Sequence, residues 1–369
     1  MPLPVTDLIY PDANSQMIVA LEPAHNIHHS LVLLSRTEEF SGFDEWIYRT
    51  ASIMTPEERE TNMLVMIGLH YATVPDGGYP SFPVYLEHLA GESPLRLRNR
   101  ILDAYIKIVG DDGTGKDYDE ILADVNSYLG FLRRGFGEDQ FDPDVEKRAY
   151  TYLIDPPAMQ QLIVGHLRAM WYKYLAVEWE RVRPMLQKSV RAFESADLAS
   201  MGRQEATEYV IGRPIKEECW QKMLDTAPQV IFVPSAHVGP YTKIFEGRGL
   251  IWVIFGARQP VDAGEVVPEL SRAELLVRLN ALADDSRLNI LKLVADQGEL
   301  RSQDIMNLLD ISQSGASRHL QQLTAAGFLT KRPCNGAKCF TLDSDRLNAT
   351  LQALSSYLSP AMDHASSAR

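Results

Sequence analysis

The residues best suited to chemistry lie near the carboxyl terminus, on one face of a predicted helix. The chain between Ile311 and Leu342 has four Lys or Arg and no acid, although the whole protein carries a net charge of −13. Amides, hydroxyls and a guanidinium match the donors and acceptors of base edges and the charge of phosphate. The window therefore predicts a nucleic-acid-binding face, made of Gln313, Ser314, Ser317, Arg318, Gln321 and Gln322.

Local signals define the helix that would carry this face. Ser312 precedes the helical pattern and can cap it, because a serine hydroxyl accepts a hydrogen bond from an unsatisfied amide of the first turn. Ala316, Leu320 and Leu323 recur at helical spacing and predict the buried side. Gly327 ends the helix, since glycine enters the left-handed conformation at low cost.

The neighbouring segments predict a helix-turn-helix followed by a hairpin. A shorter helix over Ser302–Leu309 joins the polar-faced helix through a sharp turn at Asp310-Ile311. Two short strands, Phe328–Arg332 and Ala337–Leu342, flank Asn335-Gly336, which favours a tight turn. The cations on the hairpin are Lys331, Arg332 and Lys338.

Residues Leu270–Leu342 resemble the winged helix-turn-helix of ArsR-type transcriptional regulators. The resemblance rests on ALADDSRLNILKLV (Ala281–Val294), ISQSGASRHLQQL (Ile311–Leu323) and AAGFLTKR (Ala325–Arg332). It implies a dimeric, operator-binding regulator whose second helix reads the major groove and whose wing touches the backbone. The alternative is a winged helix that only dimerises or docks another protein.

The resemblance and the residue types together assign roles on DNA. Arg318 is suited to a bidentate guanine contact, and glutamine suits adenine. His319 and the wing cations would touch phosphate and fix the register. The predicted DNA-binding set is Ser312, Gln313, Ser314, Ser317, Arg318, His319, Gln321, Lys331, Arg332 and Lys338.

The metal sites of the family do not carry over to this sequence. The family places cysteines in the helix before the reading helix, or Asp and His in the C-terminal helix. Here the first helix reads SQDIMNLL, and the end of the chain offers only Asp363-His364. Cys334 and Cys339 flank the hairpin turn and are either a redox switch or two ordinary thiols.

Two patterns in the N-terminal part have the form of binding sites. His25, His28 and His29 share one helical face and could hold a divalent metal, but no local acid or cysteine completes the set, so a solvated or interdomain polar face is favoured. Gly110–Lys116 has phosphate-loop spacing, but Asp117 stands where Ser or Thr is needed, and the preceding residues have helical periodicity. We predict an inter-helix loop there.

An aromatic cluster is the remaining candidate site. Its residues are core, or they wall a ligand cavity: Trp171, Tyr172, Tyr174 and Trp179. The sequence has no nucleophile elbow, no paired catalytic carboxylates and no metal-ligand signature. We therefore expect no enzyme, no metal and no cofactor.

Length and charge predict the domain organisation. At 369 residues the chain is too long for one winged helix. Residues 271–369 have a net charge of +1 and the remainder −14, so the N-terminal part should face away from DNA. We predict a helical N-terminal domain over 1–256, a linker over 257–270, the winged helix over 271–358 and a tail over 359–369. The fold class is mainly α (α+β), with a small antiparallel sheet formed by Val230–Pro234 and Leu250–Gly256.

The sequence also indicates where and with what the protein acts. It contains no apolar run of 18 residues, its start lacks the features of a secretory signal, and its three cysteines suit a reducing cytoplasm. The leading hypothesis is a cytoplasmic, sequence-specific repressor that binds operator DNA as a homodimer through helices near Leu270–Leu282 and Leu342–Leu358. Its N-terminal domain would sense an unidentified small-molecule effector or strengthen the dimer. The alternative is a ligand-binding or enzymatic N-terminal module with an accessory DNA-binding domain.

Overall fold

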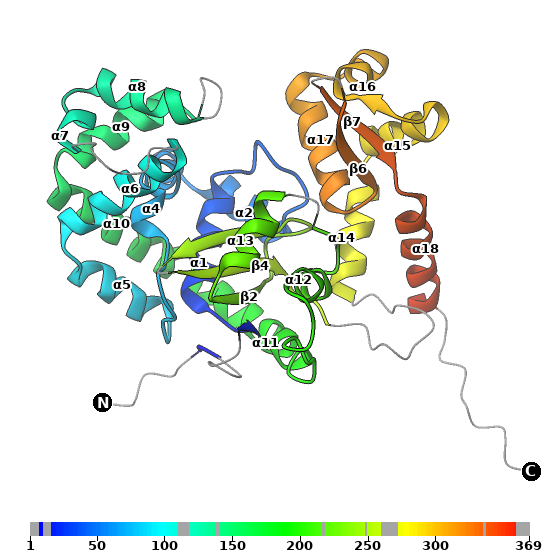
Figure 1. Cartoon of the computed structure of the whole chain (residues 1–369), viewed down its shortest axis with the longest axis horizontal. Coiled ribbons are helices and arrows are strands. Elements are labelled where there is room, and N and C mark those ends of the chain that lie inside the picture. The colour runs from blue at the N-terminus through cyan, green and yellow to red at the C-terminus, as the bar shows by residue number, and fades with distance from the viewer. Residues whose placement is uncertain are drawn as a thin grey trace, which may run out of the picture.

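The protein folds into two lobes with separate hydrophobic cores (Figure 1). The computed structural model describes residues 7–9, 16–109, 118–136, 141–215, 218–247, 249–259, 272–334 and 337–358. The predicted tail and most of the predicted linker lie outside these residues. In the part of the chain described, no helix is both long and apolar enough to cross a membrane.

The N-terminal lobe is mostly helical, and its helices surround one small sheet (Figure 1). Its elements in chain order are β1 Met17–Val19, α1 Pro23–Leu34, α2 Glu45–Ile53, α3 Pro56–Met63, η1 Leu64–Gly68, α4 His70–Thr73, α5 Phe82–Gly91, α6 Pro94–Val109, α7 Tyr118–Ile121, α8 Val125–Phe136, α9 Pro143–Leu153, α10 Pro156–Met170, η2 Trp171–Leu175, α11 Ala176–Ala192, α12 Arg203–Ile211, α13 Glu218–Thr226, β2 Gln229–Ser235, β3 Lys243–Gly247 and β4 Leu250–Gly256.

The sheet has the strand order β1-β2-β4-β3. Strand β2 pairs in parallel with β1 and with β4, whereas β3 and β4 are antiparallel. The expected small sheet is therefore present, but its two main runs pair in parallel and not antiparallel. The intervening strand β3 makes the hairpin with β4, so β4 runs in the same direction as β2.

The parallel pairing agrees with the burial of these strands on both faces. One face contributes Val230 and Phe232 to the large helical core, and the other contributes Ile231 and Val233 to a second, smaller cluster. Strands covered on both faces are continuous apolar runs, as expected for a parallel sheet between helices. The carboxyl ends of β2 and β4 lie together, because Ser235 pairs with Gly256.

Helix α1 is enclosed by the N-terminal lobe, and this corrects one prediction. His25, His28 and His29 do not form a solvated or interdomain face; all three are buried around the ring of Phe245, with ring centroids 6.4, 5.7 and 5.9 Å away. Strand β3 brings Phe245 to this helix. The prediction of an exposed polar face was wrong because the rest of the lobe covers α1 on every side.

The C-terminal lobe is a winged helix-turn-helix with its own core, centred on Ile290, Leu320 and Phe328. A three-stranded sheet of order β5-β7-β6 forms the wing. The elements of this lobe are α14 Arg272–Leu282, α15 Asp285–Gln297, β5 Leu300–Arg301, α16 Ser302–Leu309, α17 Gln313–Ala325, β6 Leu329–Cys334, β7 Ala337–Leu342 and α18 Ser344–Leu358.

Candidate nucleic-acid interface

Helix α17 begins and ends where the sequence predicts. The hydroxyl of Ser312 accepts a hydrogen bond from the amide of Gly315 at 3.2 Å. Asp310 has a φ of 50° and makes the sharp turn after α16, and Gly327 has a φ of 85° beyond the end of α17. Both values lie in the left-handed region, which glycine favours and which Asp tolerates better than most side chains.

The first half of α17 presents a polar, acid-free surface. Ser312, Gln313, Ser314, Ser317 and Gln321 are exposed. The stripe predicted to be buried is buried: Ala316, Leu320 and Leu323 are each at most 2% exposed. A recognition helix contacts base edges mainly through its N-terminal residues. The exposed first half of α17 is therefore the half that would contact DNA.

The second half of α17 turns toward the N-terminal lobe. Gln322, predicted on the polar face, is only 1% exposed and accepts a hydrogen bond from the Ser41 hydroxyl at 2.6 Å. Arg318 is half-buried. Burial raises the pKa of Tyr48 on α2, and the positive charge of Arg318 acts against that rise. Gln322 was misplaced because its neighbour comes from another lobe, more than 200 residues away in sequence.

His319 points inward and not along the exposed face. Its Nδ1 lies 3.8 Å from the Asp284 carboxylate at the N-terminus of α15. Burial lowers its pKa, although the Asp284 charge acts in the opposite direction. A phosphate contact by His319, as the sequence predicts, would require this side chain to turn outward.

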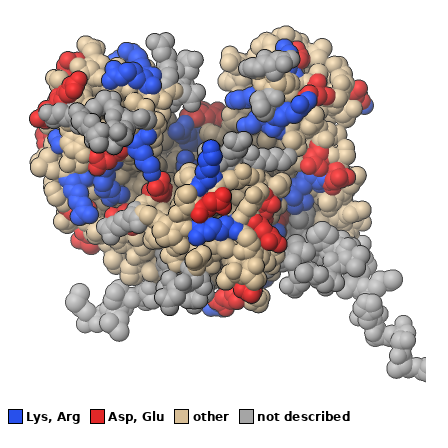
Figure 2. Space-filling model, viewed as in Figure 1, with Lys and Arg blue, Asp and Glu red and all other residues tan. Residues whose placement is uncertain are grey.

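The wing carries three exposed cations. Lys331 and Lys338 project from β6 and β7, and Arg332 pairs with Glu299. Arg332 would therefore exchange Glu299 for phosphate on binding DNA. Figure 2 shows Lys and Arg side chains on the winged-helix lobe beside the hollow between the lobes. The predicted Asn335-Gly336 turn lies outside the described residues, as do Gly110–Lys116 and Asp363-His364.

The wing cysteines face each other across the hairpin. Cys334 and Cys339 form a disulfide, with Cα atoms 5.9 Å apart. The sequence left a redox role and two ordinary thiols as alternatives, and this geometry makes the redox pair chemically feasible. The bond spans the two strands that carry the wing cations.

Two other helices of the C-terminal lobe pack together and expose apolar side chains. Helices α14 and α18 are in contact. Their large exposed hydrophobic residues are Leu276, Leu351, Tyr357 and Leu358. These are the helices that the sequence predicts for dimerisation.

The capped helix, the turn before it and the basic wing define the class of this domain, a winged helix-turn-helix with a free reading face. A comparison with protein families agrees, since the family described as "Bacterial regulatory protein, arsR family" matches residues 284–331. Two relatives each match part of the chain. The transcriptional activator HlyU of Vibrio cholerae is 33% identical over 86 residues, which are 23% of this chain and 79% of that protein.

The second relative is the arsenic resistance transcriptional regulator ArsR1 of Pseudomonas putida. It is 45% identical over 51 residues, which are 14% of this chain and 40% of that protein. The chain belongs to the ArsR family of bacterial regulatory proteins. The predicted resemblance is thereby confirmed, and the coarse prediction of a DNA-binding transcriptional regulator is supported.

The aromatic residues predicted as core or cavity wall have separate environments. Trp171 packs on Phe82 with ring centroids 5.4 Å apart, whereas Tyr172 is 72% exposed. Tyr174 donates a hydrogen bond to Glu58, and the buried Trp179 donates one to Asp7. None of the four lines the cavity that lies between the lobes.

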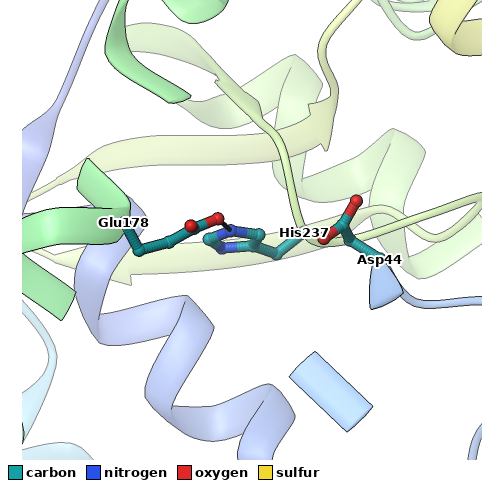
Figure 3. A group of neighbouring side chains, drawn as sticks. All are labelled: Asp44, Glu178 and His237. Atoms are coloured by element: carbon teal, nitrogen blue, oxygen red, sulfur yellow. Dashed lines mark hydrogen bonds and ion pairs between the residues drawn. The ribbon is translucent and has the colours of Figure 1, made fainter. Parts of the chain in front are cut away.

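A polar network on the N-terminal lobe has donor atoms close enough for a metal. Asp44 precedes α2, Glu178 lies on α11 and His237 lies in the loop after β2. Their potential ligand atoms lie within 4.8 Å of one another (Figure 3). His237 already bonds Glu178 through Nε2 and Ser30 through Nδ1, each at 2.8 Å. Arg181 also pairs with Glu178. These contacts satisfy both imidazole nitrogens, so the geometry describes a structural network.

Proposed function

We propose that this protein is a sequence-specific regulator that binds operator DNA as a homodimer and whose N-terminal lobe controls that binding. The observation that carries the proposal is the exposed first half of α17. It offers Gln313, Ser314 and Ser317 without any acid, next to the cations of the wing. Such a surface combines base-reading groups with phosphate-neutralising groups.

The dimer in this proposal forms through α14 and α18. Their exposed Leu276, Leu351 and Leu358 would be covered by the same surface of a second copy. Two reading helices related by a twofold axis would then require two half-sites about one helical turn apart.

We further propose that the bound dimer acts as a repressor, in the cytoplasm, by blocking access to a promoter. The Vibrio relative is named an activator, so the test must register either sign. Transcription of a template that carries the selected site should fall when the protein is added. A rise would overturn the repressor role and leave the DNA-binding role intact.

Selection of bound fragments from random duplex DNA tests the central claim. We expect an enriched, twofold-symmetric site, bound by two copies of the full chain at low salt. The selection is repeated with and without cell metabolites to detect an effector. Absence of enrichment, or binding to all duplexes with equal affinity, would contradict sequence-specific reading.

An enzymatic N-terminal lobe is the second candidate, because Ser30, His237 and Glu178 form a hydrogen-bonded series of the types used in nucleophilic catalysis. Against it, Ser30 is 2% exposed and donates to the Asn26 carbonyl of its own helix at 2.9 Å. We therefore propose a regulatory lobe and expect no labelling of Ser30 by a fluorophosphonate. Labelling at Ser30 would establish the enzymatic alternative.

A further inference from the structure

A cavity of about 680 Å³ lies between the two lobes. One wall is formed by Ser235 and Gly256, at the carboxyl ends of the parallel strands β2 and β4. The opposite wall is formed by α14 and by Arg346 of α18. Ligands of open α/β sheets bind at the carboxyl ends of the strands, so this edge is where a small molecule is expected. Here a ligand would touch both lobes at once.

The cavity wall carries an excess of positive charge. Five arginines line it against three acids, although the N-terminal part of the chain is strongly acidic overall. These charged residues are Arg181, Arg213, Arg258, Arg278 and Arg346 with Asp44, Glu45 and Glu274. A cavity of this composition attracts anions.

Arg278 has a single side-chain partner among the described residues. It is 6% exposed, and among the described residues its guanidinium makes one hydrogen bond, 3.4 Å long, to the Thr350 hydroxyl. A guanidinium has five N–H donors, so Arg278 keeps donors for a ligand in the cavity. Burial lowers the pKa of Arg278 to about 10, and repulsion from Arg346 adds to this effect.

The guanidinium groups of Arg346 and Arg258 differ in how many hydrogen bonds they make. In the described part of the chain, the guanidinium of Arg346 makes one hydrogen bond, of 3.3 Å, to the Ala326 carbonyl. Burial lowers its pKa. Arg258 makes an ion pair with Glu274 at 2.7 Å and donates a hydrogen bond to the Tyr209 carbonyl at 2.6 Å. Arg258 therefore holds the lobes together, whereas Arg278 and Arg346 are free to receive an anion.

We infer that this interdomain cavity binds a small anion, held by Arg278 and Arg346, and that the anion is the effector of the regulator. The chemistry recognised is a carboxylate or a phosphoryl group, since both accept paired guanidinium hydrogen bonds. The effector role rests on the proposed DNA-binding function, whereas anion binding does not.

The cavity is connected to the reading helix by direct contacts. Asn280 lines the cavity, and its side-chain oxygen accepts a hydrogen bond from Gln322 of α17 at 3.4 Å. Gly42 also lines it, beside Ser41, which bonds the same glutamine. An anion that draws α14 toward the strand ends would thus move groups that hold α17.

Calorimetric titration of the full chain at constant ionic strength tests the site, with inorganic phosphate and succinate as separate probes and chloride as the reference. We expect at least one probe to bind the wild-type protein. Arg278→Gln and Arg346→Gln should each weaken it about 10–100-fold, as expected for the loss of charged hydrogen bonds. The probe that binds distinguishes a phosphoryl from a carboxylate ligand.

Arg133→Gln is the matched control, because Arg133 is exposed on α8 and does not line the cavity. It should bind the probe as the wild type does. If Arg278→Gln fails to fold, Arg346→Gln and Arg278→Lys provide the same comparison. The inference would be overturned if neither probe bound, or if the cavity variants bound the probe with the affinity of the wild type.

The effector role is measured separately, as DNA affinity with and without the binding probe at matched ionic strength. We expect a change of about fivefold or more, within the usual range of allosteric coupling. An unchanged DNA affinity would overturn the effector role. A protein that binds the anion but no DNA would instead contradict the proposed function.

Discussion

Side chains on α17 differ in what they can read, and the difference follows from their position. Gln313, Ser314 and Ser317 are exposed on the first half of the helix, while Arg318 lies half-buried at the border with the N-terminal lobe. The guanidinium of Arg318 is the only charged group of the helix apart from any charge on His319. It is therefore the best single candidate for a guanine contact.

Arg318→Ala should relax sequence preference at one position of the binding site. The loss of a bidentate contact to guanine is expected to cost about 1–3 kcal/mol with the preferred base and little with the other three. Competition binding with site variants, each changed at one base pair, provides the measurement. Equal weakening on every duplex would show that Arg318 binds phosphate.

Lys331→Ala is the comparison for Arg318, because Lys331 is an exposed cation on the wing. Its loss should weaken binding to all duplexes alike and reduce the dependence of log K on log salt by about one unit. A base-specific effect of Lys331→Ala would place the wing in the groove and not on the backbone.

Buried histidines determine how the N-terminal lobe responds to acid. Burial lowers the pKa of His29 to about 3, and of His70 and His166 to about 4, and it lowers the pKa of His28 well below the usual value. Glu146 acts in the opposite sense, because burial raises its pKa to about 7. Four groups thus resist protonation in the folded state, and one favours it.

The free energy of unfolding should fall as the pH drops below about 6.5, the ordinary histidine value. The unfolded chain takes up protons at these histidines where the folded chain does not, and each contributes up to about 1.4 kcal/mol per pH unit. Glu146 takes up a proton in the folded state, and this offsets the loss of stability caused by about one of the four histidines. Urea midpoints at pH 7.5, 6 and 5 provide the measurement. A constant or rising midpoint on acidification would contradict the burial of these histidines.

At the scale of elements, α17 depends on its first turn for both stability and binding. Ser312 caps the helix and is exposed on the side predicted to face DNA. Ser312→Ala should lower the stability of the winged helix by about 1 kcal/mol, because the cap is lost. Denaturant unfolding monitored on this lobe checks the value.

Ser312→Asp separates the two roles of this residue. Aspartate also caps helices, so stability should be retained, but its carboxylate would face phosphate and weaken DNA binding. If the Asp variant bound DNA as tightly as the wild type, the N-terminus of α17 would not lie against the duplex.

Elements determined by nearby residues could be predicted from the sequence, and α17 is the best example. Its cap, its buried stripe and the glycine beyond it all lie within 16 residues, from Ser312 to Gly327. The direction of strand pairing could not be predicted from nearby residues. Strand β1 joins β2 from more than 200 positions away. The apolar runs of β2 and β4 were predicted to pair antiparallel, although runs covered on both faces are typical of parallel sheets.

Residues between the lobes were the hardest to find from sequence. Arg278 lies within LLVRLNAL, in a segment predicted to form a dimerisation helix, and nothing in the sequence placed Arg346 beside it. The contact of Ser41 with Gln322 likewise joins segments with no shared local pattern. Such sites depend on how the two lobes meet, which hydrophobic periodicity does not specify.

At the scale of the whole molecule, a buried ion pair fastens the winged helix to the N-terminal lobe. Arg258 follows β4, Glu274 belongs to α14, and the two side chains are 8% and 14% exposed. Removal of one partner from a buried pair leaves an uncompensated charge, which typically costs about 3–5 kcal/mol. The arrangement of the two lobes should therefore depend strongly on Glu274.

Glu274→Gln should loosen the contact between the lobes while leaving each core intact. Hydrogen exchange of the full chain is the measurement, and we expect faster exchange in α14 and around Ser41 and Gln322, with no change at buried Ile290. The matched control is Glu299→Gln, because Glu299 pairs with the exposed Arg332 of the wing. A surface pair of that kind contributes about 0–1 kcal/mol, so its loss should leave the exchange between the lobes unaltered. If both variants exchange alike, the Arg258–Glu274 pair does not hold the lobes together.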